Sequence, residues 1–151
     1  MKRLNFTIGM AGVLVSMAVP WAHSQGDPSA DVLAGVEVLQ SRLADLQAQS
    51  ADRADDPTFY YELGNVYADL TRRDEAVAAY ESALDLDPEY VEALVNLGAI
   101  RNEQGKSDEA VTLLTEAVEL RPTDAKALVN LGNAYYSKGD YYAAMSRFRK
   151  A

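Results

Sequence analysis

The sequence contains no cysteine, and its only histidine is His23. Without cysteine the protein has no disulfide framework, no thiolate metal ligand and no cysteine nucleophile. Basic residues are also scarce, with 14 Lys and Arg against 23 Asp and Glu in 151 residues. Because an acidic chain repels phosphate groups, we expect neither nucleic acid nor an anionic lipid surface as a partner.

Residues 1–24 differ in character from the rest of the chain. A basic start is followed by an uncharged apolar run that ends at Pro20, and by small residues at Ala22 and Ser24. This layout is typical of a secretory signal peptide that is cleaved after Ser24. The alternative is an uncleaved segment that anchors the protein in the inner membrane, although the run is shorter than the roughly 20 apolar residues of a spanning helix. The Lys-Arg-led form indicates bacterial export, so we expect a periplasmic or secreted protein.

Cleavage there removes two basic residues and His23, which leaves 12 basic against 23 acidic residues and a net charge of −11. The mature chain then has neither His nor Cys, which excludes a Ser-His triad and a histidine zinc site. The acid pairs Asp55-Asp56 and Asp74-Glu75 could serve as general acid and base. Both pairs lie at expected helix starts, where acids stabilise the helix dipole. We therefore expect no enzyme, no cofactor and no metal.

Residues 25–56 are expected to form a flexible segment, an amphipathic helix and a polar linker. Turn-forming residues come first, and apolar residues then follow at steps of four, three, four and three, which is a helical stripe. These residues are Val32, Val36, Leu39, Leu43 and Leu46. Two interpretations of helix 32–46 stay open: a capping helix that docks on the following unit, or a short coiled coil that oligomerises the chain.

The rest of the sequence repeats itself every 34 residues. Leu-Gly pairs at 63–64, 97–98 and 131–132 define this spacing. In the same phase recur Ala76, Ala110 and Ala144, then Tyr80, Leu114 and Phe148, then Ala83, Ala117 and Ala151, while Pro88 and Pro122 close the first two units. Self-similarity at this period indicates helix–turn–helix units that bury their apolar faces only by stacking.

This pattern resembles the tetratricopeptide repeat (TPR) family over residues 57–151. The resemblance implies an all-α, right-handed superhelical solenoid, preceded here by the short N-terminal helix. The units are then 57–90, 91–124 and an incomplete 125–151. Since the third unit is incomplete, we expect either a longer protein or a partner chain that covers this end.

Three positions depart from the family pattern. The usual Trp is replaced by Tyr60, Leu94 and Leu128. Arg101 stands where the other units have Tyr67 and Tyr135, and Thr71 stands where they have turn glycines. The glycines of the Leu-Gly pairs are expected to meet the alanines at 76, 110 and 144 where paired helices cross, with the large residues at 80, 114 and 148 in the wider gap. Asp56 and Pro57 predict a helix start, and Ser107 and Asp140 are the expected caps of second helices.

In the TPR family the first helices line a concave surface that binds peptides or a helix of another protein. The resemblance implies a groove that contains Tyr61, Asn65, Val95, Asn96, Asn102, Lys126, Asn130, Asn133 and Tyr136. The other groove positions are Thr58, Glu62, Ala68, Asp69, Glu92, Ala99, Glu103, Val129 and Ser137. An asparagine amide both donates and accepts, so it can bind a peptide backbone of any sequence. Asparagine is also common at two of these positions in the family, so its contact with a ligand stays open.

Some family members hold a ligand's C-terminal carboxylate with cations and asparagines. Asn65, Asn96 and Lys126 match that arrangement, but Tyr61 and Asn130 replace two of its three cations. Because charge-assisted hydrogen bonds dominate such a grip, we do not expect the complete clamp.

The first two units are acidic, whereas the third has five basic residues against Asp140 alone. This asymmetry indicates either head-to-tail association or a solvated basic face.

The sequence thus predicts a non-enzymatic scaffold that binds a peptide or partner protein on its concave surface in the bacterial cell envelope and assists assembly or positioning of a complex. The alternative is a structural oligomeriser that uses helix 32–46 and head-to-tail stacking. Contact with a membrane is expected only through an uncleaved N-terminal segment.

Overall fold

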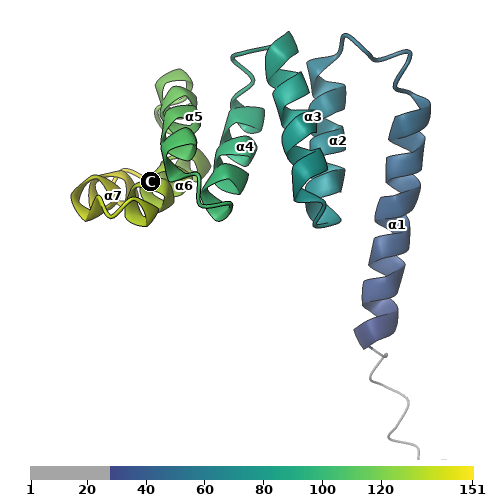
Figure 1. The fold of residues 1–151 in the computed structure, drawn as a ribbon, viewed down its shortest axis with the longest axis horizontal. Helices are drawn as coiled ribbons and strands as arrows, with labels where there is room; N and C mark the ends of the chain where they lie inside the picture. Colours follow the sequence, from purple (N-terminus) through teal and green to yellow (C-terminus); the bar gives the residue numbers. More distant parts are fainter. Residues whose placement is uncertain (1–27) are drawn as a thin grey trace, which may run out of the picture.

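A computed structural model describes residues 28–151 as an all-α solenoid (Figure 1). A long helix α1 (Pro28–Ala48) precedes three helix pairs. These are α2 (Pro57–Asp69) with α3 (Arg73–Leu86), α4 (Val91–Glu103) with α5 (Ser107–Leu120), and α6 (Ala125–Ser137) with α7 (Tyr141–Phe148). The predicted all-α solenoid of helix–turn–helix units is therefore confirmed. The predicted signal peptide, residues 1–24, lies outside the described residues.

Side-chain caps set three of the helix starts, at Asp56, Asp124 and Asp140. Asp56 accepts a hydrogen bond from the backbone N–H of Thr58 at 2.9 Å, and Pro57 is the first residue of α2, as predicted. Asp140 accepts from the backbone N–H of Ala143 at 3.0 Å, so it caps α7 as predicted. Each cap satisfies a backbone donor that the first turn of a helix leaves without a partner.

The start of α5 differs from the prediction. Ser107 is the first residue of the helix and not its cap, because the cap position falls on Lys106. The Ser107 hydroxyl instead donates to Asn102 Oδ1 at 3.1 Å. The second helices end where the prolines predict, since Pro88 and Pro122 each follow the last helical residue by two positions.

Within each pair, a large side chain of the second helix lies on a glycine of the first. A Cβ atom added to the glycine would lie within 2.5–2.6 Å of that side chain. The pairs are Gly64 with Tyr80, Gly98 with Leu114, and Gly132 with Phe148. The large residues, which were predicted to fill a wider gap, are therefore the glycines' nearest neighbours, and the alanines at 76, 110 and 144 are buried. Each glycine lacks a side chain so that a bulky one can contact the helix backbone.

The turn inside each pair needs a residue with left-handed backbone geometry. Gly105 and Gly139 provide it at φ +77° and +82°. Thr71 occupies the equivalent place in the first unit at φ 58°. This is a conformation that a β-branched residue rarely adopts.

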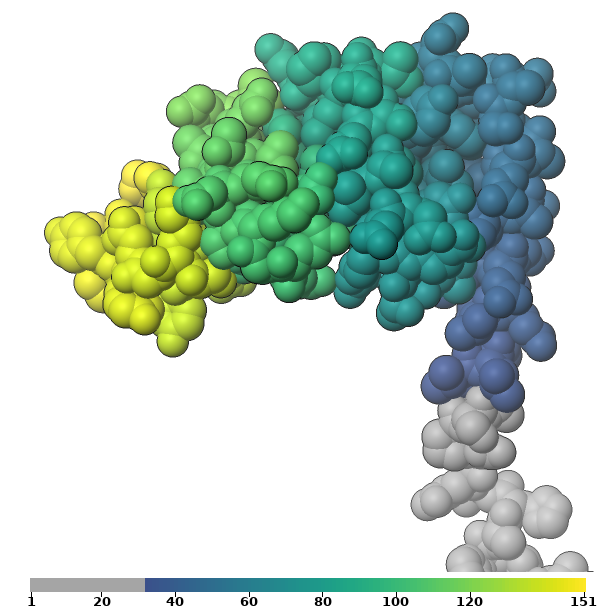
Figure 2. Space-filling view, viewed as in Figure 1, coloured from purple at the N-terminus to yellow at the C-terminus, as the bar shows by residue number. Residues whose placement is uncertain are grey.

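α1 covers the first pair with only its C-terminal half. Leu43 and Leu46 are buried against Phe59 and Val66 of α2, which confirms the capping interpretation for this half. With 21 residues against 13 in α2, the N-terminal half of α1 extends beyond the pair (Figures 1 and 2). Its exposed apolar residues are Val32, Leu33, Val36 and Val38. Neither α1 nor another helix within residues 28–151 has the length and hydropathy to cross a membrane.

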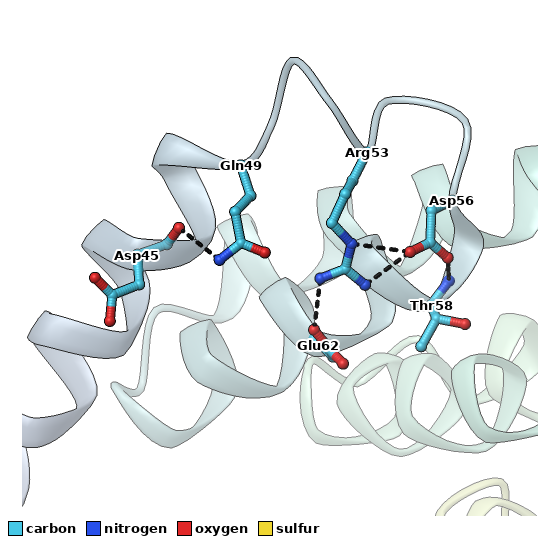
Figure 3. A network of polar contacts seen from close by, with 6 residues as sticks. All are labelled: Asp45, Gln49, Arg53, Asp56, Thr58 and Glu62. Carbon is cyan, nitrogen blue, oxygen red and sulfur yellow. Dashed lines mark hydrogen bonds and ion pairs between the residues drawn. The ribbon is translucent and has the colours of Figure 1, made fainter.

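Arg53 fastens the connection between α1 and α2 (Figure 3). Its guanidinium donates to Asp56 at 2.7 and 2.9 Å and to Glu62 at 3.1 Å. It also lies 5.1 Å from the centre of the Phe59 ring, one of the residues on which α1 docks. The hydrogen bond from Arg53 lowers the pKa of Asp56, so the capping carboxylate stays ionised well into the acidic range.

Candidate functional site

The first helices of the three pairs place three predicted groove residues in one hydrogen-bonded row. Asn65 lies on α2, Asn96 on α4 and Lys126 on α6. Lys126 Nζ donates to Asn96 Oδ1 at 2.7 Å, and Asn96 Nδ2 donates to Asn65 Oδ1 at 2.9 Å. The row therefore links all three repeat units.

Tyr80 of α3 supports this row from the protein interior. Its hydroxyl donates to Asn65 Oδ1 at 2.7 Å and accepts from Asn96 Nδ2 at 3.3 Å. Burial raises the pKa of Tyr80 to about 12, so the hydroxyl remains a donor. The repeat pattern predicted Tyr80 only as a core residue. The sequence feature that could have indicated its place in the row is its hydroxyl, because Leu114 and Phe148 at the equivalent positions have no side-chain polar atom that needs a hydrogen bond.

A cavity of about 490 Å³ opens beside the row, with walls from α1, α2, α3, α4 and α6. It is lined by Arg42, Asn65, Ala68, Asp69, Arg73, Tyr80, Asn96, Ala99, Ile100, Glu103 and Lys126. Most of these positions were predicted for the groove. Four were not, because Arg42, Arg73 and Tyr80 lie outside the first helices and Ile100 does not belong to the family's groove positions.

The cavity carries positive charge although the protein is acidic. Arg42, Arg73 and Lys126 face Asp69 and Glu103 across it. Arg73 pairs with Glu103 at 3.2 Å, whereas Arg42 and Lys126 form no ion pair among residues 28–151. No three His, Cys, Asp or Glu side chains in this part of the chain lie close enough together to hold a metal ion.

The hydrogen-bonding groups that remain available at the row are mainly donors. Asn65 Oδ1 accepts two bonds, and Asn96 Nδ2 uses both of its hydrogens. In the part of the chain that the structure describes, Asn65 Nδ2 and the Arg42 guanidinium make no hydrogen bond, and Lys126 Nζ makes one of its three. A ligand rich in acceptors, such as backbone carbonyls or carboxylates, therefore suits this cavity.

Three other predicted groove residues lie apart from the cavity lining. Tyr61 is half-buried, with its ring centre 6.0 Å from that of Tyr80 and 5.2 Å from that of Tyr90. Val95 is 2% exposed and packs in the core among α4, α5 and α6, so it offers no surface to a ligand. Asn102 Oδ1 accepts the hydrogen bond from Ser107, the first residue of α5.

The remaining predicted residues lie along α6. Asn130 is half-buried, and Asn133 is exposed. Tyr136 is 62% exposed and makes an edge-to-face contact with Tyr141 at 5.2 Å. None of the three lines the cavity, which reaches the third unit only through Lys126.

Solved structures with the same fold include a crystal structure of MamA, with a TM-score of 0.70 and 22% identity over 78% of this chain and 68% of that chain. MamA 41-end from Desulfovibrio magneticus RS-1 gives a TM-score of 0.69 and 24% identity, over 83% and 74% of the two chains. At this level of identity the likeness concerns the fold. No curated protein sequence matches the chain.

The family model of the tetratricopeptide repeat matches residues 61–125 and again residues 102–151. Together the two matches run through all three helix pairs and cover more than half of the sequence. They include the three Leu-Gly pairs and the large residues that pack on them. The chain belongs to the tetratricopeptide repeat family.

Proposed function

We propose that this protein is a non-enzymatic scaffold that binds an extended peptide or a segment of a partner protein in the cavity along α2, α4 and α6. It does so in the bacterial cell envelope, where it assists the assembly or positioning of a complex. The observation that carries the proposal is the row Asn65–Asn96–Lys126, whose available groups are donors in an open cavity. Membership of the TPR family, whose folds serve as protein-interaction scaffolds, supports it.

The chemistry of the cavity specifies an acidic segment. Asn65 Nδ2 is suited to a backbone carbonyl, and a carboxylate near Arg42 and Lys126 gains charge-assisted hydrogen bonds. Arg42 comes from α1, so the N-terminal helix takes part in ligand binding as well as in capping. The excess of cations here also steers an acidic partner to one place on an otherwise acidic surface.

A displayed peptide library selected on the full chain tests this proposal. Enriched peptides are expected to contain Asp or Glu, and copies with Asn and Gln in their place are expected to bind about tenfold more weakly. Arg42→Gln and Lys126→Gln are expected to weaken binding similarly. Arg149→Gln and Lys150→Gln, which remove exposed cations outside the cavity, are the matched controls. Equal binding by all four variants would contradict the proposed site.

The envelope location rests on the N-terminal sequence and has its own test. Expression in a Gram-negative bacterium, followed by fractionation and mass spectrometry, is expected to find a periplasmic protein that begins at Gln25. An intact N-terminus in the membrane fraction supports the anchored alternative. A cytoplasmic protein with an intact N-terminus contradicts both.

The exposed half of α1 favours a second candidate function, self-association. Val32 and Val36 continue the stripe that buries Leu43 and Leu46, but they have no partner among the described residues. If this stripe joins copies of the chain, the double substitution Val32→Ser and Val36→Ser should convert an oligomer to a monomer in sedimentation velocity. A wild-type chain that remains monomeric at high concentration and physiological salt excludes association through this stripe.

A further inference from the structure

The middle repeat unit has a cation where its neighbours have an aromatic ring. Tyr67 lies under the guanidinium of Arg72, with 4.7 Å to the ring centre, and Tyr135 lies under that of Arg147 at 6.0 Å. At the equivalent place on α4, the Arg101 side chain is only 15% exposed. The residue that departs from the repeat pattern is thus largely buried and part of the packing.

Arg101 joins three helices. Its guanidinium pairs with Glu81 of α3 and, at 3.2 Å, with Glu109 of α5, and it donates to Gln104 at 3.2 Å. Two carboxylates therefore neutralise the guanidinium, and three side-chain oxygens accept its hydrogen bonds or ion pairs. The guanidinium is therefore a fixed part of the wall between α3 and α5, which flank α4 (Figure 1).

A cavity of about 410 Å³ lies beside this guanidinium, on the face formed by the second helices. Its apolar lining is Leu84 of α3, Leu97 of α4 and Leu113 of α5, and its rim carries Glu81, Asp85 and Glu109. The volume is sufficient for a bulky side chain of a partner. We call this cavity the second-helix groove.

The charge around the second-helix groove is opposite to that of the first cavity. Helix α3 carries four acids against Arg73, and α5 carries four acids and no base. Asp85 on the rim makes no ion pair among residues 28–151. Since Arg101 is neutralised by two carboxylates, the field at the rim attracts cations.

We propose that the second-helix groove is a second binding site, which takes a partner segment that presents a bulky apolar side chain next to a lysine or arginine. The apolar side chain contacts Leu84, Leu97 and Leu113, and the cation pairs with Asp85 on the rim. The two faces of the solenoid then bind segments of opposite charge: an acidic segment on the first helices and a basic segment on the second helices.

A displayed peptide library selected on the full chain tests the second site as well. Peptides that combine Lys or Arg with Phe, Leu or Trp are expected among the enriched sequences. Thr112→Trp places a large ring in the groove lining and leaves the ion pairs of Arg101 in place, so it should weaken these peptides at least about tenfold, the effect of losing one buried apolar side chain. Binding is measured by fluorescence anisotropy with labelled peptides.

Asp85→Lys provides a second variant that leaves the packing unchanged, because Asp85 is exposed on a helix surface. It should also weaken the basic peptides about tenfold, whereas Lys126→Gln should leave them within about twofold of wild type. Failure to enrich such peptides, or their retention by both Thr112→Trp and Asp85→Lys, overturns the proposal. If only Lys126→Gln abolishes binding of these peptides, they bind in the first cavity, and this result also overturns the proposal.

Discussion

A Cβ atom on Gly98 would lie 2.6 Å from Cγ of Leu114, a distance that real Cβ contacts essentially never show. Leu114 is fully buried, so it cannot move aside without disturbing its neighbours. We therefore expect Gly98→Ala to lower the free energy of unfolding by about 1–3 kcal/mol, as measured by urea denaturation.

Two further variants show whether this loss comes from the contact. In Gly98→Ala with Leu114→Ala the combined loss should be smaller than the sum of the single losses, because both substitutions act on one contact. A Cβ atom on Gly35 of α1 would meet no other atom within 4 Å, so Gly35→Ala should stabilise the chain by about 0.5–1 kcal/mol. A neutral Gly98→Ala would contradict the close packing of Leu114 on Gly98.

A substitution in the turn between α2 and α3 should stabilise the fold. Thr71 has φ 58°, and the equivalent Gly105 and Gly139 have φ +77° and +82°. Thr71→Gly should raise the free energy of unfolding by about 0.5–1 kcal/mol, because the relief of left-handed strain exceeds the entropy cost of glycine. The reverse change, Gly105→Ala, should lower it by about 1 kcal/mol. Thermal unfolding that gives the same sign for both variants would refute this explanation.

The Tyr80 hydroxyl is expected to make stability fall at high pH. Its pKa is raised from 10.0 to about 12 by burial, so the folded state favours the protonated phenol. The stabilisation is complete below pH 10 and is lost as the pH rises through about 12. Tyr80→Phe should therefore reduce the loss of stability in this interval, measured by denaturation at a series of pH values.

Tyr142 provides the matched control because its side chain is 83% exposed. Tyr142→Phe should leave the pH dependence of stability as in wild type. An ultraviolet titration should likewise lose its last phenol in Tyr80→Phe. Identical curves for the two variants would show that the Tyr80 hydroxyl is not held in the row.

The fold could be predicted because the 34-residue pattern places small and large side chains at fixed steps. Gly64, Gly98 and Gly132 mark the close approach of paired helices, where the nearest neighbour of each glycine is the large residue of the second helix. The row could be predicted in part, since Asn65, Asn96 and Lys126 lie on neighbouring helices with equivalent orientation.

Other parts of the site depend on tertiary contacts that a repeat pattern does not encode. Arg42 reaches the cavity because Leu43 and Leu46 dock α1 on α2, and that register follows from packing alone. Val95 occupies a predicted groove position, but the neighbouring unit covers it and buries it in the core. Tyr80 joins the row because its hydroxyl needs a partner once the ring is buried.

Removing the Arg53 cation should release the connection between α1 and α2. In Arg53→Gln the pKa of Asp56 should rise towards its ordinary value of 3.8, because the hydrogen bond from Arg53 is the largest cause of its depression. A carboxyl group whose pKa is depressed in the folded state stabilises the fold at pH values above its unfolded-state pKa, and this stabilisation is lost as the pH falls through the folded-state pKa. The variant should therefore lose less stability in acid than the wild type.

Carboxyl carbon shifts in NMR follow the titration of Asp56 directly, and faster hydrogen exchange in α1 would report its weaker docking. Lys106→Gln, which breaks a contact of the same spacing with Glu109 on α5, is the matched control and should leave both readings for Asp56 and α1 unchanged. An unaltered Asp56 titration in Arg53→Gln would contradict the role of Arg53.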